Sequence, residues 1–459
     1  MASLQVFCVS NQYWNSIRVP KARTNKFSLG SSVIRSEEVG SLNLNKENDR
    51  KKPQILIAGG GIGGLVLALA AKNRGFEVKV FEKELSAVRG EGQHRGPIQL
   101  QTNALAVLEA IDKDVAEQIR DAGCITGNRI NGLADGRSGE WITKIDLLTP
   151  ALTRGLPVTR VICRMTLQDI LMDAVGSDIV YNRSNVVDII EEPDKVTVVL
   201  EDGRRFEGDL LVGADGIWSK VRSKLFGWKE AKYSNYTCYS GLLDYVPPYN
   251  DTVGLRVFLG LNQFFVALDV GGGKMQWLSF HKEPPRNTDP LGGKKKRLLE
   301  LFGSWCDEVT MLIAETPEHI ILQRDIYDRD MICCWGRGLV TLLGDAAHPM
   351  YPTLGQGGCM AIEDCYQLIV ELEKVVESNS GTKMSEEISH ALKRYERNRV
   401  IRNGILHAVA RMALRMVSFY IPNLNFGWRI RDPAFHIARF VSGLVMQRMM
   451  NWIINGDGV

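Results

Sequence analysis

A glycine-rich turn near residue 60 limits the folds open to this chain. The apolar stretch Gln54–Ala58 has the composition of a buried parallel strand and runs directly into residues 59–64 (GGGIGG). A good helix-forming sequence follows at 65–72, and an alternating strand at 76–81 then ends on Glu82. Strand, turn, helix and strand in this order predict the first unit of a Rossmann-type parallel sheet.

The spacing of these glycines is typical of dinucleotide binding. Gly59 allows the tight turn, Gly61 lets the backbone approach a pyrophosphate, and Gly64 permits close packing of helix on strand. Glu82 lies 18 residues beyond Gly64, where an acid accepts hydrogen bonds from a ribose. The unit therefore predicts a bound dinucleotide, and FAD and NAD fit it equally well.

Two later strands end on aspartate. Residues 209–214 (DLLVGA) lead into Asp215, and residues 339–343 (LVTLL) lead through glycine into Asp345. An Asp-Gly pair alone indicates only a turn, but an aspartate at a strand end can also bind a ribityl hydroxyl. The glycine-rich turn 355–358 precedes a helix, so its backbone N–H groups can stabilise an anion on a flavin ring.

In this order the three motifs resemble the FAD-dependent monooxygenases of the aromatic-hydroxylase type. Within that family, residues 89–112, 122–133, 154–171, 208–222 and 355–364 look like the corresponding parts of plant zeaxanthin epoxidases. The resemblance implies an α/β fold with a doubly wound, three-layer Rossmann-type FAD-binding domain. It also implies an inserted antiparallel β-sheet substrate domain and a helical C-terminus.

The resemblance assigns roles to residues that match the family's motifs. Arg95 and Arg164 match arginines on the flavin side of the pocket, and Pro352 packs over the flavin ring. Arg95 and Pro352 are the candidates for a direct part in catalysis, since the flavin chemistry needs neither a protein nucleophile nor a metal. The residues implied to bind FAD are Gly59, Gly61, Ile62, Gly63, Gly64, Glu82, Lys83, Arg95, Arg164, Asp215, Gly344, Asp345, Pro352, Gly355, Gln356, Gly357 and Gly358.

The implied reaction is epoxidation of the β-ring of a xanthophyll, zeaxanthin to antheraxanthin and violaxanthin, through a C4a-hydroperoxyflavin on the route to abscisic acid. It uses FAD, O2 as co-substrate, and NAD(P)H or reduced ferredoxin as reductant. One alternative is a plastid hydroxylase of a phenolic or quinone, because residues 344–352 (GDAAHPMYP) look more like the general hydroxylase form. Another is a non-catalytic flavin-fold protein that binds isoprenoids or partners. We expect no room for the forkhead-associated domain that follows the flavoprotein body in the epoxidases.

The chain between the second and third flavin motifs has the alternating pattern of an antiparallel sheet. We expect a substrate domain at 130–155 and 229–324, inserted into an FAD-binding domain at 53–129, 156–228 and 325–400. The side chains that either line an apolar substrate channel or fill the core of the sheet are Phe258, Phe265, Trp277 and Phe280.

The two ends of the chain are basic. Residues 1–36 carry five Lys and Arg, seven Ser and no acid, which is typical of an organelle transit peptide, and a linker continues to 52. Residues 391–459 carry eleven Lys and Arg against three acids, and 401–459 predict amphipathic helices. Such helices either pack onto the protein or lie in a membrane interface. We therefore expect a plastid protein, peripheral on the thylakoid or envelope, with an apolar carotenoid substrate and no nucleic-acid partner. Nine scattered cysteines predict free thiols and no metal site.

Overall fold

A six-stranded sheet forms the centre of the computed structural model, which describes residues 52–85, 96–245, 252–285, 292–378, 381–419 and 433–454. Its strand order is β18-β19-β12-β1-β2-β8. All neighbouring strands are parallel except the β18–β19 hairpin. The strands are β1 (Gln54–Ala58), β2 (Glu77–Phe81), β8 (Val180–Tyr181), β12 (Leu210–Gly213), β18 (Gly336–Arg337) and β19 (Val340–Leu342).

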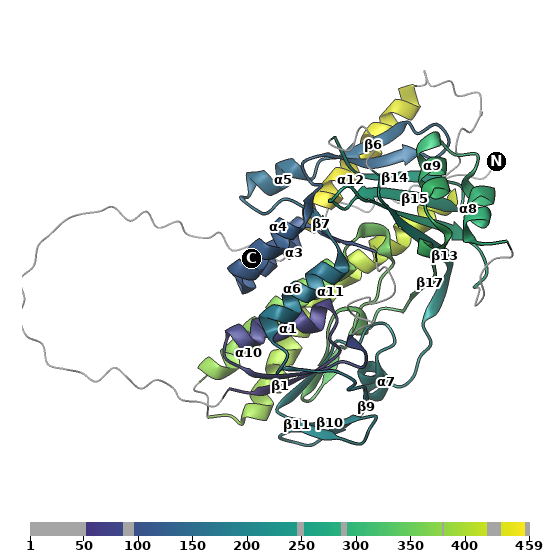
Figure 1. The fold of residues 1–459 in the computed structure, drawn as a ribbon. Helices are drawn as coiled ribbons and strands as arrows, with labels where there is room; N and C mark the ends of the chain where they lie inside the picture. The colour runs from purple at the N-terminus through teal and green to yellow at the C-terminus, as the bar shows by residue number, and fades with distance from the viewer. Residues whose placement is uncertain are drawn as a thin grey trace, which may run out of the picture. The chain divides into compact units, whose positions relative to one another are not determined.

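Helices cover one face of this sheet and a small sheet covers the other, which gives three layers (Figure 1). Because both faces are covered, β12 and all of β1 after Gln54 are apolar and buried rather than alternating. The helices are α1 (Ile62–Asn73), α3 (Thr102–Ile111), α4 (Lys113–Ala122), α6 (Arg164–Val175) and α10 (Gly357–Glu377), and α7 (Lys220–Phe226) packs on β9. The small sheet consists of β9 (Val186–Glu191), β10 (Val196–Leu200) and β11 (Arg205–Gly208). The predicted Rossmann-type architecture is confirmed.

A second large sheet has seven strands in the order β17-β13-β16-β15-β14-β5-β6. Helices α8 (Lys294–Phe302) and α9 (Asp307–Glu315) cover one of its faces. The strands are β5 (Ile130–Asp135), β6 (Trp141–Ile145), β13 (Lys232–Leu243), β14 (Val253–Gly260), β15 (Gln263–Asp269), β16 (Met275–Lys282) and β17 (Leu322–Asp328). Neighbouring strands are antiparallel except β5 and β14, which pair in parallel. The predicted inserted sheet is present, and its antiparallel pattern holds at every pair but this one.

Short elements connect the two large sheets. The strands β3 (Ile98–Leu100), β7 (Arg160–Ile162) and β4 (Cys124–Ile125) form a three-stranded antiparallel sheet. The remaining short elements are the helix α5 (Leu148–Thr153) and the 3-10 turns η1 (Glu318–Ile320), η2 (Gly344–Ala346) and η3 (Pro352–Leu354).

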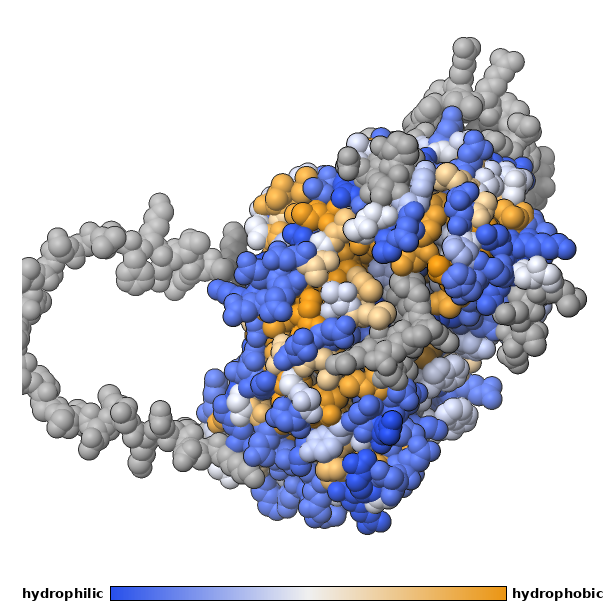
Figure 2. Space-filling model, in the orientation of Figure 1, coloured by the Kyte–Doolittle hydropathy of each residue, from blue (hydrophilic) through white to orange (hydrophobic). Residues whose placement is uncertain are grey.

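Two long helices form the C-terminal part of the chain. Helix α11 (Met384–Phe419) packs along α10, and α12 (Pro433–Ile454) contacts α3, α5 and β6. The predicted FAD-binding domain ends at residue 400 and the predicted C-terminal helices begin at 401. Helix α11 crosses this boundary without a break. Hydrophobic residues gather across the middle and upper part of the face in Figure 2, where α5 and α12 lie in Figure 1, and hydrophilic residues cover the lower end around β10 and β11. None of the described helices is long and apolar enough to cross a membrane.

Candidate functional site

The sequence motifs meet at one edge of the parallel sheet. Strands β2, β1, β12 and β19 are neighbours, so their carboxyl ends lie side by side. The Gly59 amide donates to Phe81 O at 2.8 Å, and the Ala214 amide donates to Ala58 O at 2.8 Å. In open α/β sheets, ligands bind in the crevice beyond these carboxyl ends. The glycine turn, Glu82, Asp215 and Asp345 all follow directly from them.

The glycine turn has the geometry that the sequence predicts. Gly59 has φ of +109°, and a Cβ there would lie 2.4 Å from Ala214 O. A Cβ on Gly64 would lie 1.9 Å from Gly59 O, so the turn and helix α1 can only pack with glycine at this position. A Cβ on Gly61, by contrast, would have no atom within 4 Å. Open space at the helix N-terminus is what a pyrophosphate requires.

Glu82 lies against the same turn. Its carboxylate is buried, and it accepts hydrogen bonds from the amides of Gly60 at 2.7 Å and Glu84 at 2.9 Å. Three other predicted residues lie close by in the chain. Lys83 is exposed, and Ile62 is buried as the first residue of α1. Gly63 packs against the side chain of Leu343. The acid is thus held beside the turn, within the region that a ribose would occupy.

Asp215 borders the turn from the next strand. Its Oδ2 accepts hydrogen bonds from the amides of Lys220 at 2.7 Å and Val221 at 3.2 Å, so it caps α7. Its Oδ1 is buried without a hydrogen-bond partner among the described residues, and burial raises the pKa of this carboxyl. Asp215 thus packs beside Gly59 and fixes the start of α7.

Asp345 lies beside the N-terminus of α10. The residue is accessible to solvent, yet the surrounding protein removes its carboxyl from bulk water and thereby raises its pKa. The charges of His348 and Arg164 oppose that rise, so Arg164, at the start of α6, lies near Asp345. A Cβ on Gly357 would lie 3.9 Å from Asp345 Oδ1. Asp345 and Arg164, two of the predicted site residues, therefore lie near each other, and Asp345 also lies near the N-terminus of α10.

The loop before α10 is fixed by amide side chains. Gly355 adopts the left-handed region with φ of +64°. The buried Gln356 donates from Nε2 to Gln101 Oε1 at 2.5 Å, and Gln101 Nε2 donates to Leu354 O at 2.9 Å. Pro352, the first residue of η3, is exposed. This arrangement holds Pro352 and Gly355 in the loop directly before α10, while Gly357 and Gly358 open that helix.

A buried ion network beneath this loop was not predicted. His348 Nε2 lies 2.6 Å from Asp364 Oδ2, which also accepts a hydrogen bond from the Gly344 amide at 3.2 Å. Arg399 of α11 donates from Nε to Asp364 Oδ1 and from Nη1 to Glu363 Oε2, each at 2.7 Å. Burial alone would raise the pKa of Asp364, but the charges of His348 and Arg399 lower it to about 2. The network ties the Gly344-Asp345 turn to α10 and α11.

The structure corrects the predicted substrate channel. Phe258, Phe265 and Trp277 are fully buried on the face of the large sheet that packs against α8 and α9, so they fill a core. Phe280 is on the opposite face, where it stacks on Phe264 with ring centroids 4.3 Å apart. Alternation along the strands separates these two sets.

That opposite face carries the accessible apolar surface. The half-buried apolar residues of its strands are Val257, Leu259, Val266, Leu278 and Ile326, and Leu414 and Val417 of α11 pack against part of this face. Tyr351 belongs to the same cluster and directly precedes Pro352, so this face meets the loop before α10. A Cβ on Gly96, next to β3, would lie 3.0 Å from Gln276 Nε2 on the same face. An apolar molecule bound on this face would contact these side chains.

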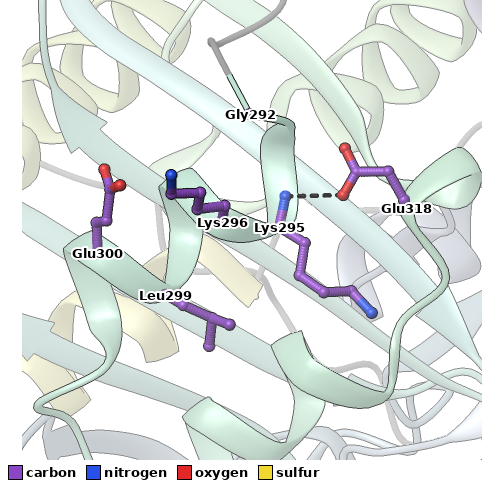
Figure 3. A pocket seen from close by; sticks show the side chains of 6 residues that line it. All are labelled: Gly292, Lys295, Lys296, Leu299, Glu300 and Glu318. Atoms are coloured by element: carbon purple, nitrogen blue, oxygen red, sulfur yellow. Dashed lines mark hydrogen bonds between the residues drawn. The ribbon is translucent and has the colours of Figure 1, made fainter.

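A separate pocket of about 590 Å³ lies at the start of α8 (Figure 3). Its lining comprises Gly292, Lys295, Lys296, Leu299, Glu300 and Glu318. Glu318 accepts hydrogen bonds from the amides of Lys294 at 2.7 Å and Lys295 at 3.0 Å, and so occupies the helix N-terminus itself. None of its lining residues belongs to the elements that carry the flavin motifs.

Arg95, one of the predicted site residues, lies outside the described residues. The predicted FAD-binding residues at the ends of β1, β12 and β19 and in the helices that follow them lie along one edge of the sheet, which we name the flavin cradle. The open space at Gly61 and the exposed Asp345 fit the pyrophosphate and ribityl chain of FAD. In the described part of the chain no cluster of three or more His, Cys, Asp or Glu could hold a metal ion.

The sequence matches the protein family described as "FAD binding domain" over residues 52–244 and 322–400. A chloroplastic zeaxanthin epoxidase from Oryza sativa subsp. japonica is 58% identical over 416 residues, or 89% of this chain and 63% of that protein. One from an Oncidium hybrid cultivar is 53% identical over 455 residues, or 97% of this chain and 68% of that protein. The chain spans less than two thirds of the length of the Oryza relative.

Solved structures resemble this fold closely. Klebsiella pneumoniae HpxO complexed with FAD and uric acid has a TM-score of 0.73 and 25% identity, covering 87% of this chain and 96% of that one. A salicylate hydroxylase substrate complex has a TM-score of 0.71 and 20% identity, covering 89% of this chain and 97% of that one.

Proposed function

The chain belongs to the zeaxanthin epoxidase family of FAD-binding proteins, and from this premise we propose that it is an FAD-dependent monooxygenase that epoxidises the β-ring of a xanthophyll. The proposed substrate is zeaxanthin, which gives antheraxanthin and violaxanthin. O2 is the proposed co-substrate, with NAD(P)H or reduced ferredoxin as reductant.

The observation that supports this function most is the apolar face above the flavin cradle. Its half-buried members Val257, Leu259, Val266 and Leu278 carry no polar group, so a hydrocarbon ring loses contact with water without leaving a buried donor or acceptor unsatisfied. Gln276 and Tyr351 contribute polar groups to the same face. The four apolar side chains support a hydrocarbon ring as the substrate.

In the proposed mechanism the protein binds, orients and keeps water out. When bound, reduced FAD supplies the activation of O2. Glu82 and the N–H groups at the start of α1 hold the ribose and pyrophosphate, and Asp345 holds the ribityl chain. The N–H groups at the start of α10 stabilise negative charge on the flavin ring. The apolar sheet face positions the ring double bond and keeps water away from it. Positioning and exclusion of water are the protein's contributions to the rate.

Conversion of a carotenoid by the purified protein tests this function. The FAD-loaded chain is incubated with a reductant system, O2 and zeaxanthin in lipid micelles, and the products are separated by chromatography. We expect antheraxanthin and violaxanthin. A flavin-loaded protein that forms no epoxide but turns over phenolic acids would support the hydroxylase alternative, and a protein that takes up no FAD would contradict both.

We further propose that the protein works in the plastid, on a membrane surface. The relatives are named chloroplastic, and the basic, acid-free residues 1–36 have the composition of a transit peptide. Thylakoid or envelope lipid is also where an apolar carotenoid resides.

Helix α11 supports this location because it carries apolar side chains on its exposed side as well as on its buried side. Leu406, Leu414 and Val417 are buried with His407, and Arg411 Nε donates to Asp328 Oδ2 at 2.6 Å. Ile401 is nevertheless 70% exposed and Met416 61% exposed. The other exposed apolar and basic side chains of α11 and α12 are Ile405, Met412, Leu444, Val445 and Trp452 together with Arg397, Arg415 and Arg448. Apolar and cationic groups on one helical surface suit an anionic lipid interface.

Replacing both Met412 and Met416 with glutamate is expected to release the protein from vesicles. Both side chains are exposed, so folding is unaffected, whereas burying a methionine in lipid contributes about 1.5–3 kcal/mol. Partitioning onto phosphatidylcholine vesicles that contain phosphatidylglycerol should fall by at least about tenfold in a flotation assay. The matched control is Ile190→Glu, an exposed apolar residue on β9. Equal flotation of all three proteins would contradict the membrane proposal.

A further inference from the structure

Two adjacent thiols lie at the entrance to the hairpin that carries the flavin motif. Cys333 and Cys334 are exposed and free, and they directly precede Trp335 and strand β18. Strand β18 pairs antiparallel with β19, and β19 leads into Gly344-Asp345. A change at the thiols therefore acts on the element that positions Asp345.

The second thiol takes part in fixing this hairpin to α11. Cys334 Sγ donates to Gly336 O at 3.2 Å. Lys393 Nζ donates to the same sulfur at 3.4 Å and to Gly336 O at 2.9 Å. The thiol, the ammonium and one backbone carbonyl thus form a closed triangle on the protein surface.

Trp335 links this triangle to the cradle. Its amide donates to Glu396 Oε2 at 2.7 Å, and that carboxylate also lies 3.3 Å from Lys393 Nζ. The Trp335 side chain is fully buried, and its ring centroid is 5.1 Å from that of His348. His348 in turn holds Asp364, the residue that accepts the Gly344 amide. A contiguous set of contacts therefore runs from the thiols to the flavin motif.

We propose that Cys333 and Cys334 form a redox-responsive dithiol, and that its oxidation to an intramolecular disulfide weakens FAD binding. The oxidant is a small-molecule disulfide: one S–S bond forms between the two cysteines, the oxidant's S–S bond breaks, and the two thiol protons pass to the two released thiols. Adjacent Cα atoms lie about 3.8 Å apart across a trans peptide, closer than the ~4.4–6.8 Å of ordinary disulfides, so ring closure must shift the backbone. The triangle with Lys393 and Gly336 is lost, and Trp335 is displaced. Such a strained disulfide is readily reduced again.

Redox titration of the full-length chain tests the proposal. Of its two readouts, the disulfide and the Kd of FAD, the second rests on the proposed FAD site. The protein is equilibrated in buffers of reduced and oxidised glutathione. The Cys333–Cys334 disulfide is quantified by mass spectrometry, and the Kd of FAD is measured by flavin fluorescence. We expect oxidation to raise this Kd by about fivefold or more, the lower end of coupling between linked sites, and dithiothreitol to restore it. By reciprocity, bound FAD should disfavour oxidation by the same factor.

Single substitutions separate the dithiol from the other cysteines. Cys333→Ser should abolish the response and keep the contacts of Cys334, whereas Cys306→Ser, at a half-buried position, should respond like the unmodified sequence. No disulfide, a stable mixed disulfide with glutathione in its place, or a disulfide without change in the Kd of FAD would each overturn the proposal. The disulfide is measured independently of flavin, so a failure of the FAD site is distinguishable from a failure of the dithiol.

Discussion

Replacing Gly61 with valine should yield a folded protein that carries no FAD. Gly61 is the N-cap of α1 with φ of −72°, a conformation open to any residue, and a Cβ there meets no atom within 4 Å. The valine costs the fold only about 1 kcal/mol of capping preference. Its side chain, however, fills the space that the pyrophosphate requires. We expect FAD affinity to fall at least about a hundredfold, which corresponds to about 3 kcal/mol.

Flavin absorbance of the purified protein and its thermal unfolding measure the two effects separately. Gly64→Ala is the matched variant, because a Cβ there would lie 1.9 Å from Gly59 O. This variant should lose the fold, whereas Gly61→Val should lose only the flavin. A folded Gly61→Val protein with full flavin content would show that the cofactor binds elsewhere.

The flavin cradle could be predicted because local backbone geometry determines it. The glycines near residue 60 and the aspartates after β12 and β19 follow strands that are recognisable by their apolar composition alone. Parallel strands bring their carboxyl ends to one edge, so residues far apart in the sequence converge without any knowledge of side-chain packing.

The substrate face could be predicted only in part. Alternation in β14–β16 shows that Phe258, Phe265 and Trp277 share a face, and that Val257 and Val266 share the other. Sequence alternation contains no information on which face meets the flavin and which meets α8 and α9. Large aromatic residues did not decide between a channel and a core, because a packed core uses them as readily as a binding surface does.

The buried ion network could not be predicted from composition. Arg399 belongs to the basic tail, where a count of charges suggests a surface. Its partners Asp364 and Glu363 lie 35 and 36 residues earlier, on α10. Only the packing of α11 along α10 removes this arginine from water, so its role depends on the tertiary fold.

Replacing Arg399 with methionine should therefore destabilise the protein strongly. Arg399, Asp364 and Glu363 are all almost fully buried, and the variant leaves two carboxylates with fewer partners. Removing one member of a buried ion pair costs about 3–5 kcal/mol of unfolding free energy. Urea denaturation measures this loss, and Arg397→Met, an exposed arginine on the same helix, is the control. Equal stability of both variants would contradict the proposed role of the network.

The pH dependence of stability distinguishes a lost ion pair from lost packing. Asp364 has a pKa of about 2 in the folded protein against an ordinary value of 3.8. A carboxyl whose folded pKa is lowered stabilises the fold above its unfolded pKa, and this contribution disappears as pH falls through the folded pKa. The parent protein should therefore lose stability between pH 3.8 and about 2 more steeply than Arg399→Met, in which the pKa of Asp364 returns toward its ordinary value. Parallel curves over that window would mean that Arg399 contributes by filling space. Diverging curves would show that its charge holds Asp364, and through it the Gly344-Asp345 turn, in place.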